Sequence, residues 1–242
     1  MGKTTTAVNV AASLAVAEKR VLLVDTDSQG NTTSGLGFDR NDLAHSLYDF
    51  YTGGTSMQEI IRDTMLPRLK LVPSSVDLIG AEIELVGSEG KETLLREGIR
   101  SVSNQFDYVI IDCPPSLGIL TLNALVAAKT VLVPVQCEYY ALEGLGQLMR
   151  TVELVRGSFN PELEIEGILL TMVDLRNTLA RQVADEVKKH FGDKVYRTVI
   201  PRNVTLSEAP SHGKPVMLYD VRSSGAQSYL ALAREVLGGP NG

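Results

Sequence analysis

Apolar residues along the chain follow two spacings that alternate from one end to the other. Between residues 4 and 18, apolar residues such as Ala7, Ala11 and Leu14 recur every three or four positions, which predicts an amphipathic helix. The next run, Val21–Val24, is apolar at every position and is typical of a strand buried on both faces of a parallel sheet. Because this alternation continues, we expect an α/β fold with a mostly parallel sheet and helices on both of its faces.

The same two spacings predict the strands and helices in the rest of the chain. They predict strands over residues 69–73, 107–112, 130–135, 165–173 and 199–200, and helices over residues 43–51, 79–85, 92–103, 120–128, 138–156, 181–190 and 223–237. Residues 33–37, Thr-Ser-Gly-Leu-Gly, are expected to form a flexible turn. The 242 residues contain no internal repeat and no low-complexity linker, so residues 1–242 are expected to form one domain.

Composition and charge restrict the classes of protein to consider. With only two cysteines, Cys113 and Cys137, we expect a reducing compartment and no disulfide framework, and the lack of C-x-x-C spacing argues against a metal site. No apolar stretch approaches the roughly 18 residues of a membrane span, and no signal peptide precedes the first helix, so we expect a cytoplasmic protein. The net charge is −6, yet the stretch Arg176–Arg222 carries nine Lys and Arg against five Asp and Glu. This basic stretch is the expected polyanion-binding surface, and a solvated helix face is the alternative.

Candidate chemistry begins at the start of the chain. Gly2-Lys3-Thr4 is the second half of the phosphate-binding pattern G-x-x-x-x-G-K-[ST], in which the lysine neutralises phosphate charge and the hydroxyl binds Mg²⁺. If the first helix begins here, its free N–H groups point toward a bound phosphate. Three residues alone are a weak signal, so the interpretation depends on what the rest of the chain supplies.

Two predicted strands end in carboxylates. Asp25 and Asp27 follow the first apolar run, and Asp112 closes the run that starts at Tyr108. Because the carboxyl ends of parallel strands meet at one edge, we expect these carboxylates at a ligand crevice, where they would orient water or hold Mg²⁺. The alternative for the first pair is a polar turn. Cys113 is expected to be a small buried residue and not a nucleophile, since no histidine lies near it in the sequence.

Several segments, in this order, resemble the ParA/Soj family of chromosome- and plasmid-partitioning ATPases. They are Gly2–Thr6, Val24–Asn31, Asp107–Pro115, Glu138–Gly144, Val199–Asn203 and Leu206–Ser211. The match covers essentially the whole chain. The resemblance implies a P-loop ATPase fold, ATP and Mg²⁺ as cofactors, and a homodimer that forms on ATP binding. It also implies binding to DNA without sequence specificity, association with the nucleoid, stimulation by a ParB-like partner, and no membrane attachment.

The resemblance further implies roles for individual residues. The nucleotide-binding set comprises Gly2, Lys3, Thr4, Thr5, Glu138, Met172, Pro201 and Asn203. Of these, Glu138 would touch nucleotide across the dimer, and the last three would line the adenine pocket, although ordinary packing is equally expected for Met172 and Pro201. The metal set is Thr4, Asp25 and Asp112, and the catalytic pair is Lys3 with Asp27, which would orient the attacking water. Thr205 stands where the family often has a basic residue, which puts one DNA contact in doubt.

The chain departs from the family pattern at its start. The family loop reads Lys-Gly-Gly-Val-Gly-Lys-Thr-Thr, and Met1 stands at the valine position. We therefore expect an incomplete N-terminus, without the signature lysine, two of the glycines and the first P-loop strand near the sheet centre, and with weak ATP binding and poor dimerisation. Two alternatives remain: a truncated pseudo-ATPase that binds a partner without turnover, and a MinD-like cell-division ATPase. The second is disfavoured because the last predicted helix is not basic-faced. An iron–sulfur protein is disfavoured by the cysteine spacing.

Overall fold

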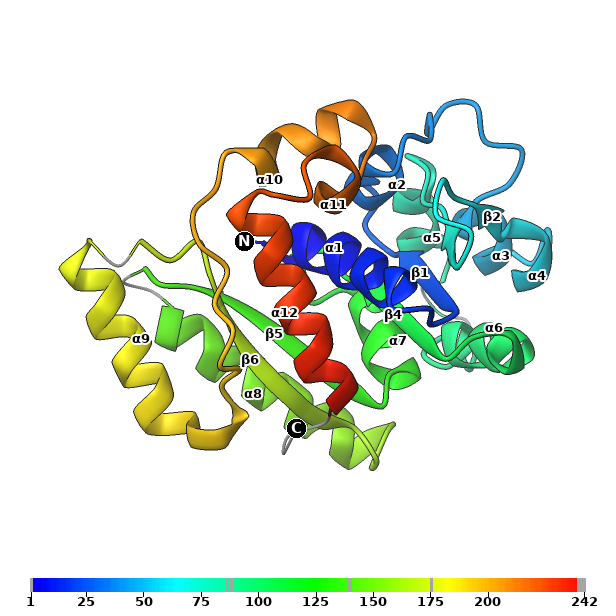
Figure 1. Cartoon of the computed structure of the whole chain (residues 1–242). Helices are drawn as coiled ribbons and strands as arrows, with labels where there is room; N and C mark the ends of the chain where they lie inside the picture. Colours follow the sequence, from blue (N-terminus) through cyan, green and yellow to red (C-terminus); the bar gives the residue numbers. More distant parts are fainter. Residues whose placement is uncertain (1, 86, 88, 139–140, 175, 239–242) are drawn as a thin grey trace.

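The computed structural model describes residues 2–85, 87, 89–138, 141–174 and 176–238 (Figure 1). Its first sheet has the strand order β2-β3-β1-β4. The strand β1 (Val21–Asp25) runs parallel to β3 (Leu69–Val72) and to β4 (Tyr108–Asp112), while the short β2 (Arg62–Asp63) is antiparallel at one edge. A second, parallel pair is formed by β5 (Thr130–Gln136) and β6 (Glu164–Thr171). The mostly parallel arrangement expected from the apolar runs is therefore confirmed.

Helices cover both faces of the first sheet, as the apolar run in β1 predicts. Successive residues of a strand point to opposite faces. Val21 and Leu23 pack in one core cluster with α1 (Lys3–Val16) and α12 (Ser224–Gly238). Leu22 and Val24 pack in a second cluster with α6 (Leu94–Val102) and α7 (Ile119–Ala127). A strand with two buried faces needs apolar residues at every position, which explains the unbroken run.

The remaining helices complete the two layers. They are α2 (Asn31–Gly35), α3 (Leu47–Tyr51), α4 (Met57–Ile60), α5 (Leu78–Glu84), α8 (Ala141–Ser158), α9 (Thr178–Phe191), α10 (Thr205–Glu208) and α11 (Val216–Tyr219). Single 3₁₀ turns occur at Ser103–Gln105, Gly192–Lys194 and Ala209–His212. A third core cluster joins β5 and β6 to α8 and α9, and Figure 1 shows α9 at one side of the molecule. No helix in the described residues is long and apolar enough to cross a membrane.

Two local predictions were wrong. The flexible turn expected at residues 33–37 is mostly helical, because α2 occupies Asn31–Gly35 and Asp25 accepts hydrogen bonds from both the N–H and the hydroxyl of Thr33. The strand expected at residues 199–200 is instead an irregular segment with a single parallel bridge between Val173 and Pro201. Backbone hydrogen bonds continue on both sides of Pro201, from Ile200 to Leu170 and from Arg202 to Val173, but proline has no N–H of its own, so no regular strand forms there.

Other elements were found with shifted ends. The helix expected from residue 43 begins at Leu47, where the hydroxyl of Ser46 and the carboxylate of Asp49 form a capping box. The strand expected over residues 165–173 ends at Thr171, because Met172 has a φ of 53° and leaves the extended conformation. The helix expected from residue 138 is seen from Ala141 onward, and residues 139–140 lie outside the described part of the chain.

Polar contacts tie α1 to the end of the chain. The hydroxyls of Thr6 and Tyr229 lie 3.1 Å apart, and both residues are buried. Asn9, also buried, donates to the carbonyl of Thr5 over 2.7 Å and accepts the backbone N–H of Val216 over 2.8 Å. Because buried polar groups cost stability when they lack partners, these contacts fix how α11 and α12 sit on α1.

Replacing Tyr229 with phenylalanine should lower the free energy of unfolding by about 1–2 kcal/mol, because the buried Thr6 hydroxyl then loses its partner. Urea denaturation followed by circular dichroism measures the change. Tyr48→Phe is the control: that hydroxyl reaches Glu84 at the surface and should matter by less than about 0.5 kcal/mol. Equal losses in the two variants would contradict the prediction.

Candidate functional site

The first turn of α1 is built to receive an anion. Gly2 caps the helix with a φ of 111°, a conformation that favours glycine, and an added Cβ would lie 3.3 Å from Oγ1 of Thr171. No side chain caps the helix, so the N–H groups of its first turn remain free for a ligand within the described residues. Lys3 and Thr4 are half-buried beside them. Free N–H groups, the helix dipole and a lysine together suit a phosphate group.

The carboxylates of Asp25 and Asp112 end neighbouring strands. They are direct partners in the parallel register of β1 and β4, and both are buried. Oδ2 of Asp25 accepts the N–H and the hydroxyl of Thr33, over 2.8 and 2.7 Å, and Oδ1 accepts the N–H of Asp27 over 3.2 Å. Asp25 therefore holds the loop and helix that follow β1, and its oxygens already have partners.

The carboxylate of Asp112 accepts fewer hydrogen bonds from the protein than that of Asp25. Oδ2 accepts the hydroxyl of Thr32 over 2.8 Å, while Thr26 donates its hydroxyl to the backbone carbonyl of Asp112 over 2.7 Å. Each threonine side chain comes from the segment after β1, so the ends of β1 and β4 are joined by side chains as well as by the ladder. The carboxylate of Asp112 retains acceptor capacity for a ligand.

The pKa values of the two carboxyl groups reflect this burial. Desolvation raises the pKa of Asp25 to about 7, opposed by the hydrogen bond from Thr33 and reinforced by the charge of Asp112. Burial likewise raises the pKa of Asp112; the hydroxyls of Thr32 and Thr4 and the charge of Lys3 lower it, and Asp27 raises it. Groups from α1 and from the loop after β1 therefore act on one carboxylate, which means that the structure brings Lys3, Thr4 and Asp27 together around Asp112.

Asp27 lies in a turn that is fixed from two sides. Its Oδ1 accepts the N–H of Gln29 over 2.9 Å, and its backbone carbonyl accepts the hydroxyl of Ser74 over 2.7 Å. Ser74 follows β3 and also donates its own N–H to the hydroxyl of Thr33 over 2.9 Å. Asp27 as a whole is only 7% exposed, and its charge acts on the neighbouring carboxyl of Asp112.

The second group of predicted nucleotide contacts gathers beyond β6. Met172 is exposed and follows directly on β6, and its Sδ lies 3.0 Å from Nε2 of Gln136. The bridge between Val173 and Pro201 brings the chain after residue 200 alongside it. Asn203 donates to the hydroxyl of Ser224 over 2.8 Å, so its side chain is directed to the start of α12. Met172 and Pro201 are thus brought together, and their contact with a base stays a prediction.

Glu138 stands apart from these contacts. It is exposed and lies two residues beyond the end of β5. An exposed position suits the predicted contact with nucleotide across a dimer, and that contact stays a prediction.

The donor set around Asp112 fits Mg²⁺ better than a transition metal. Among the described residues, no group of three or more His, Cys, Asp and Glu side chains is arranged to hold a metal ion. Mg²⁺ in phosphate-handling sites needs only one or two protein oxygens, because water and phosphate supply the others. The hydroxyl of Thr4 and the carboxylate of Asp112 offer such a pair, whereas burial raises the pKa of the Cys113 thiol to about 12 and makes it a poor ligand.

Four polar residues of the site were missed by sequence reasoning. They are Thr26, Thr32, Thr33 and Ser74, and all four are buried. Their signal was weak, because short hydroxyl residues next to Asp and Gly are also the usual residues of turns. Only the contacts show that they hold the carboxylates.

Several basic side chains of the stretch Arg176–Arg222 are exposed, but some of them already have partners within the protein. On α9 and after it, Lys189 lies 4.0 Å from Glu186, and Lys194 donates to the carbonyl of Ile165. Arg176 is paired with Asp174. Other side chains of the stretch are exposed and make no ion pair in the part of the chain that the structure describes. They include Lys188, Lys214 and Arg222.

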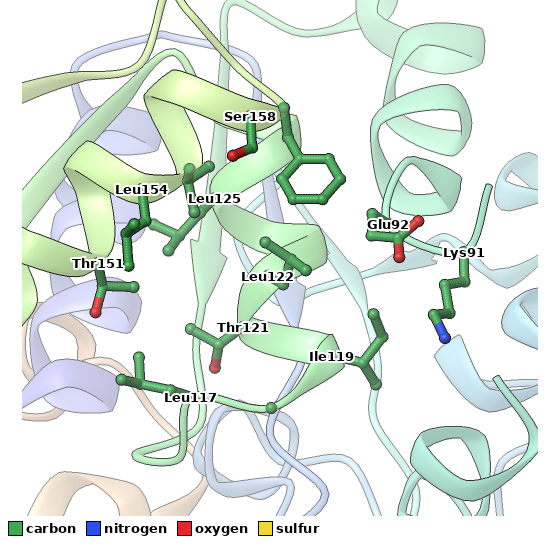
Figure 2. A pocket seen from close by; sticks show the side chains of 13 residues that line it. Lys91, Glu92, Leu117, Ile119, Thr121, Leu122, Leu125, Thr151, Leu154 and Ser158 are labelled. Atoms are coloured by element: carbon green, nitrogen blue, oxygen red, sulfur yellow. The ribbon is translucent and has the colours of Figure 1, made fainter. Parts of the chain in front are cut away.

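A cavity of about 430 Å³ lies away from these residues (Figure 2). It is formed mainly by α7 and α8, with Leu117, Leu154 and Phe159 among its lining, and Lys91 and Glu92 stand at one side. None of the predicted site residues lines it.

Comparisons with known proteins identify relatives of the chain. A family model described as an AAA domain matches residues 1–165. The chain is 57% identical to the sporulation initiation inhibitor protein Soj of Bacillus subtilis, over 98% of this chain and 93% of that protein. It is 54% identical to the chromosome partitioning protein ParA of Myxococcus xanthus, over 98% of this chain and 84% of that one.

Solved structures show the same architecture. A cobyrinic acid a,c-diamide synthase from Mycobacterium smegmatis, solved with an ATP analogue and magnesium, superposes with a TM-score of 0.85 at 37% identity and covers 98% of this chain and 89% of its own. The cell division ATPase MinD of Pyrococcus furiosus superposes with a TM-score of 0.81 at 25% identity, covering 98% and 93%. The P-loop type of α/β fold expected from the sequence is therefore confirmed.

Proposed function

Because the chain belongs to the ParA/Soj family of chromosome-partitioning ATPases, we propose that it couples ATP hydrolysis at the first turn of α1 to reversible binding of DNA. The observation that carries this proposal is the convergence of Lys3, Thr4 and Asp27 on Asp112. Phosphoryl transfer to water depends mainly on positioning and on neutralising charge, and this set of groups provides both.

Each residue has a role that its surroundings permit. The free N–H groups after Gly2 and the Lys3 ammonium bind the phosphate oxygens of ATP, with Thr5 in the same turn. Thr4 and Asp112 hold Mg²⁺, which when bound neutralises phosphate charge. Asp27 orients the attacking water. Asp25 has a positioning role, because its oxygens hold Asp27 and Thr33 in place.

The other parts of the proposal follow the family. Met172, Pro201 and Asn203 contact the base, and Glu138 contacts the nucleotide of the second subunit in a homodimer that forms with ATP. DNA binds through the exposed basic residues without reading sequence, since lysine and arginine contacts to phosphates carry no base information. A ParB-like protein stimulates hydrolysis, and the protein works on the nucleoid.

The direct test combines phosphate release with DNA co-sedimentation. We expect steady phosphate release from ATP with Mg²⁺, and more protein in the DNA pellet with ATP than with ADP or without nucleotide. Sedimentation that needs ATP but proceeds without any phosphate release, with or without DNA, would identify a binding protein without turnover. Identical pellets in all three conditions would overturn the coupling.

Removing the charges of Lys188, Lys214 and Arg222 by alanine substitution should weaken DNA binding and its dependence on salt. Each phosphate contact that is lost should reduce the slope of log K against log salt concentration by about 0.9. Fluorescence anisotropy with labelled duplex DNA at several salt concentrations measures this slope. Arg100→Ala, on the exposed part of α6 outside the basic stretch, is the matched control. An equal loss in the control would show that the site lies elsewhere.

A further inference from the structure

The turn that carries Asp27 lies partly at the surface. It comprises residues 27–30, between the end of β1 and the start of α2, and is called the Asp27 turn below. Ser28 is half-buried and Gln29 is exposed, yet Gly30 is buried although it has no side chain. Gly30 has a φ of 57°, in the left-handed region that favours glycine. Because glycine has the largest conformational freedom, a turn that ends in it needs contacts from other segments to keep one conformation.

Arg40 supplies such a contact from outside the turn. Its Nη1 donates a hydrogen bond to the backbone carbonyl of Gln29. Its aliphatic stem lies against Gly30, because a Cβ added to Gly30 would overlap Cδ of Arg40 and would lie 3.3 Å from Cγ. Arg40 therefore contributes to the burial of Gly30 and holds the carbonyl of the residue before it.

The peptide group between Gln29 and Gly30 is held on both of its sides. Its N–H, which belongs to Gly30, donates to the backbone carbonyl of Asp27 over 2.8 Å, and its oxygen accepts from Arg40. The N–H of Gln29 donates to Oδ1 of Asp27 over 2.9 Å. Arg40 thus acts on the peptide that closes the turn onto Asp27, and the same turn sets the orientation of the Asp27 carboxylate.

The segment that carries Arg40 is anchored to the core. Leu36 is buried in the cluster that contains α1, and Phe38 packs against that cluster. The N–H of Phe38 also donates to the carbonyl of Thr33 in α2 over 3.2 Å. Arg40 is only two residues beyond this anchor, so its side chain reaches the Asp27 turn from a fixed base.

The guanidinium of Arg40 makes no ion pair with a carboxylate of the described residues. A charged donor forms a stronger hydrogen bond to a carbonyl than a neutral donor does. Arginine also stays protonated at every pH at which the protein can be assayed. The charge of Arg40 is therefore directed to the Asp27 turn and to no acidic side chain in this part of the chain.

From these contacts we propose that Arg40 is a positioning residue for hydrolysis: it holds the Asp27 turn so that the Asp27 carboxylate keeps the orientation in which it directs the attacking water. The proposal rests on the proposed function, because it takes Asp27 as the group that orients water. Arg40 acts through the peptide between Gln29 and Gly30, and its role needs no contact with nucleotide. Since a misplacement of about 1 Å can cost about 10²-fold in rate, a loosened turn should lower the rate constant and leave nucleotide affinity unchanged.

Arg40→Met tests this role, because methionine keeps an unbranched stem against Gly30 and removes the guanidinium. The single-turnover rate constant of ATP hydrolysis should fall about tenfold, with the nucleotide dissociation constant within about threefold of the original. Arg40→Lys should recover the rate to within about threefold, since an ammonium can also donate to one carbonyl. Arg62→Met is the matched control: Arg62 donates to the backbone carbonyls of Glu59 and Ile61 in another part of the fold, and its loss should leave the rate unchanged.

Two further measurements separate positioning from a general loss of structure. Hydrogen exchange at the N–H of Gly30, measured on the whole chain without nucleotide, should speed up about threefold or more in Arg40→Met and stay unchanged in Arg62→Met. When Asp27 is already asparagine, Arg40→Met should lower the rate by less than about twofold further, because the carboxylate that it positions is gone. A tenfold loss in that background would show that Arg40 acts independently of Asp27 and would overturn the proposal.

The outcomes also separate this proposal from the proposed function. If the original chain hydrolyses ATP, an unchanged rate or an unchanged exchange at Gly30 in Arg40→Met overturns the role of Arg40 and leaves the proposed function standing. If the original chain releases no phosphate, the proposed function fails, and the exchange at Gly30 alone decides whether Arg40 holds the turn. Recovery of the exchange without recovery of the rate in Arg40→Lys would also overturn the proposal, because the guanidinium would then act on something other than the turn.

Discussion

Replacing Asp27 with asparagine is expected to lower the rate constant of ATP hydrolysis by about 10²–10⁴-fold, the range attributed to a positioned general acid or base. The charge of Asp27 acts on Asp112, while its Oδ1 also accepts the N–H of Gln29. Asparagine keeps an Oδ1 acceptor for that turn and loses the negative charge. The fold and the binding of ATP should therefore change little, with the nucleotide dissociation constant within about threefold of the original.

Single-turnover phosphate release and nucleotide titration measure the two quantities separately. Asp39→Asn is a matched control, because Oδ1 of Asp39 accepts the N–H of Asn41 in the same kind of turn, at an exposed position. Its hydrolysis rate should be unchanged. If Asp27→Asn hydrolysed ATP at the original rate, another group would have to orient the water.

The buried carboxyl of Asp25 should make stability fall as the pH rises. Its pKa is raised to about 7 in the folded chain by burial, from an ordinary value near 4 in the unfolded chain. The folded state therefore binds this proton more tightly, and the stabilisation is complete below about pH 4 and lost as the pH rises through about 7. Three pKa units correspond to roughly 4 kcal/mol across this window.

Asp25→Asn isolates this contribution, because asparagine does not titrate. The substitution has its own cost at every pH, since an amide N–H₂ must face one of the donors that Asp25 accepts from Asp27 and Thr33. The informative quantity is therefore the difference in the free energy of unfolding between variant and original chain. It should shift in favour of the variant by roughly 3 kcal/mol between pH 4.5 and 8, because part of the effect already lies below pH 4.5.

Urea denaturation in EDTA without nucleotide, at several pH values, gives this difference. The carboxyl groups of Asp107 and Asp174 have pKa values lowered to about 2 by hydrogen bonds from Arg20 and Arg176, so they are already ionised across this window. A flat difference for Asp25→Asn would mean that the folded chain ionises this carboxyl as easily as the unfolded chain does.

The sequence predicted the elements whose apolar pattern is set by burial on both faces. In β1 every residue is covered, so the run Val21–Val24 could be recognised without tertiary information. The carboxylates Asp25 and Asp112 could be placed at one edge for the same reason, because parallel strands end together. What could not be predicted depends on contacts between distant segments: α2 forms where Asp25 holds Thr33, and Asp27 is fixed by Ser74, 47 residues along the chain.

The irregular region before β3 was harder to predict for a second reason. Its helices α3 and α4 have five and four residues, which is too short to establish a periodic pattern. The end of β6 before Met172 could not be predicted either, because it depends on the backbone angle φ of that one residue. Roles at Glu138, Met172, Pro201 and Asn203 came from the family resemblance alone and stay predictions.

The contacts between α1 and the last helix also determine when the molecule can fold. Thr6 meets Tyr229, and Asn9 meets Val216, across 223 and 207 residues of chain. The cluster that buries Ala11 and Leu14 draws on Leu232 and Ala233 as well. Contacts this distant slow folding, and on a ribosome the apolar face of α1 must wait until α12 has been synthesised. The nascent protein therefore depends on α12 to cover α1, and a chain released before Tyr229 would expose this face to aggregation and proteolysis.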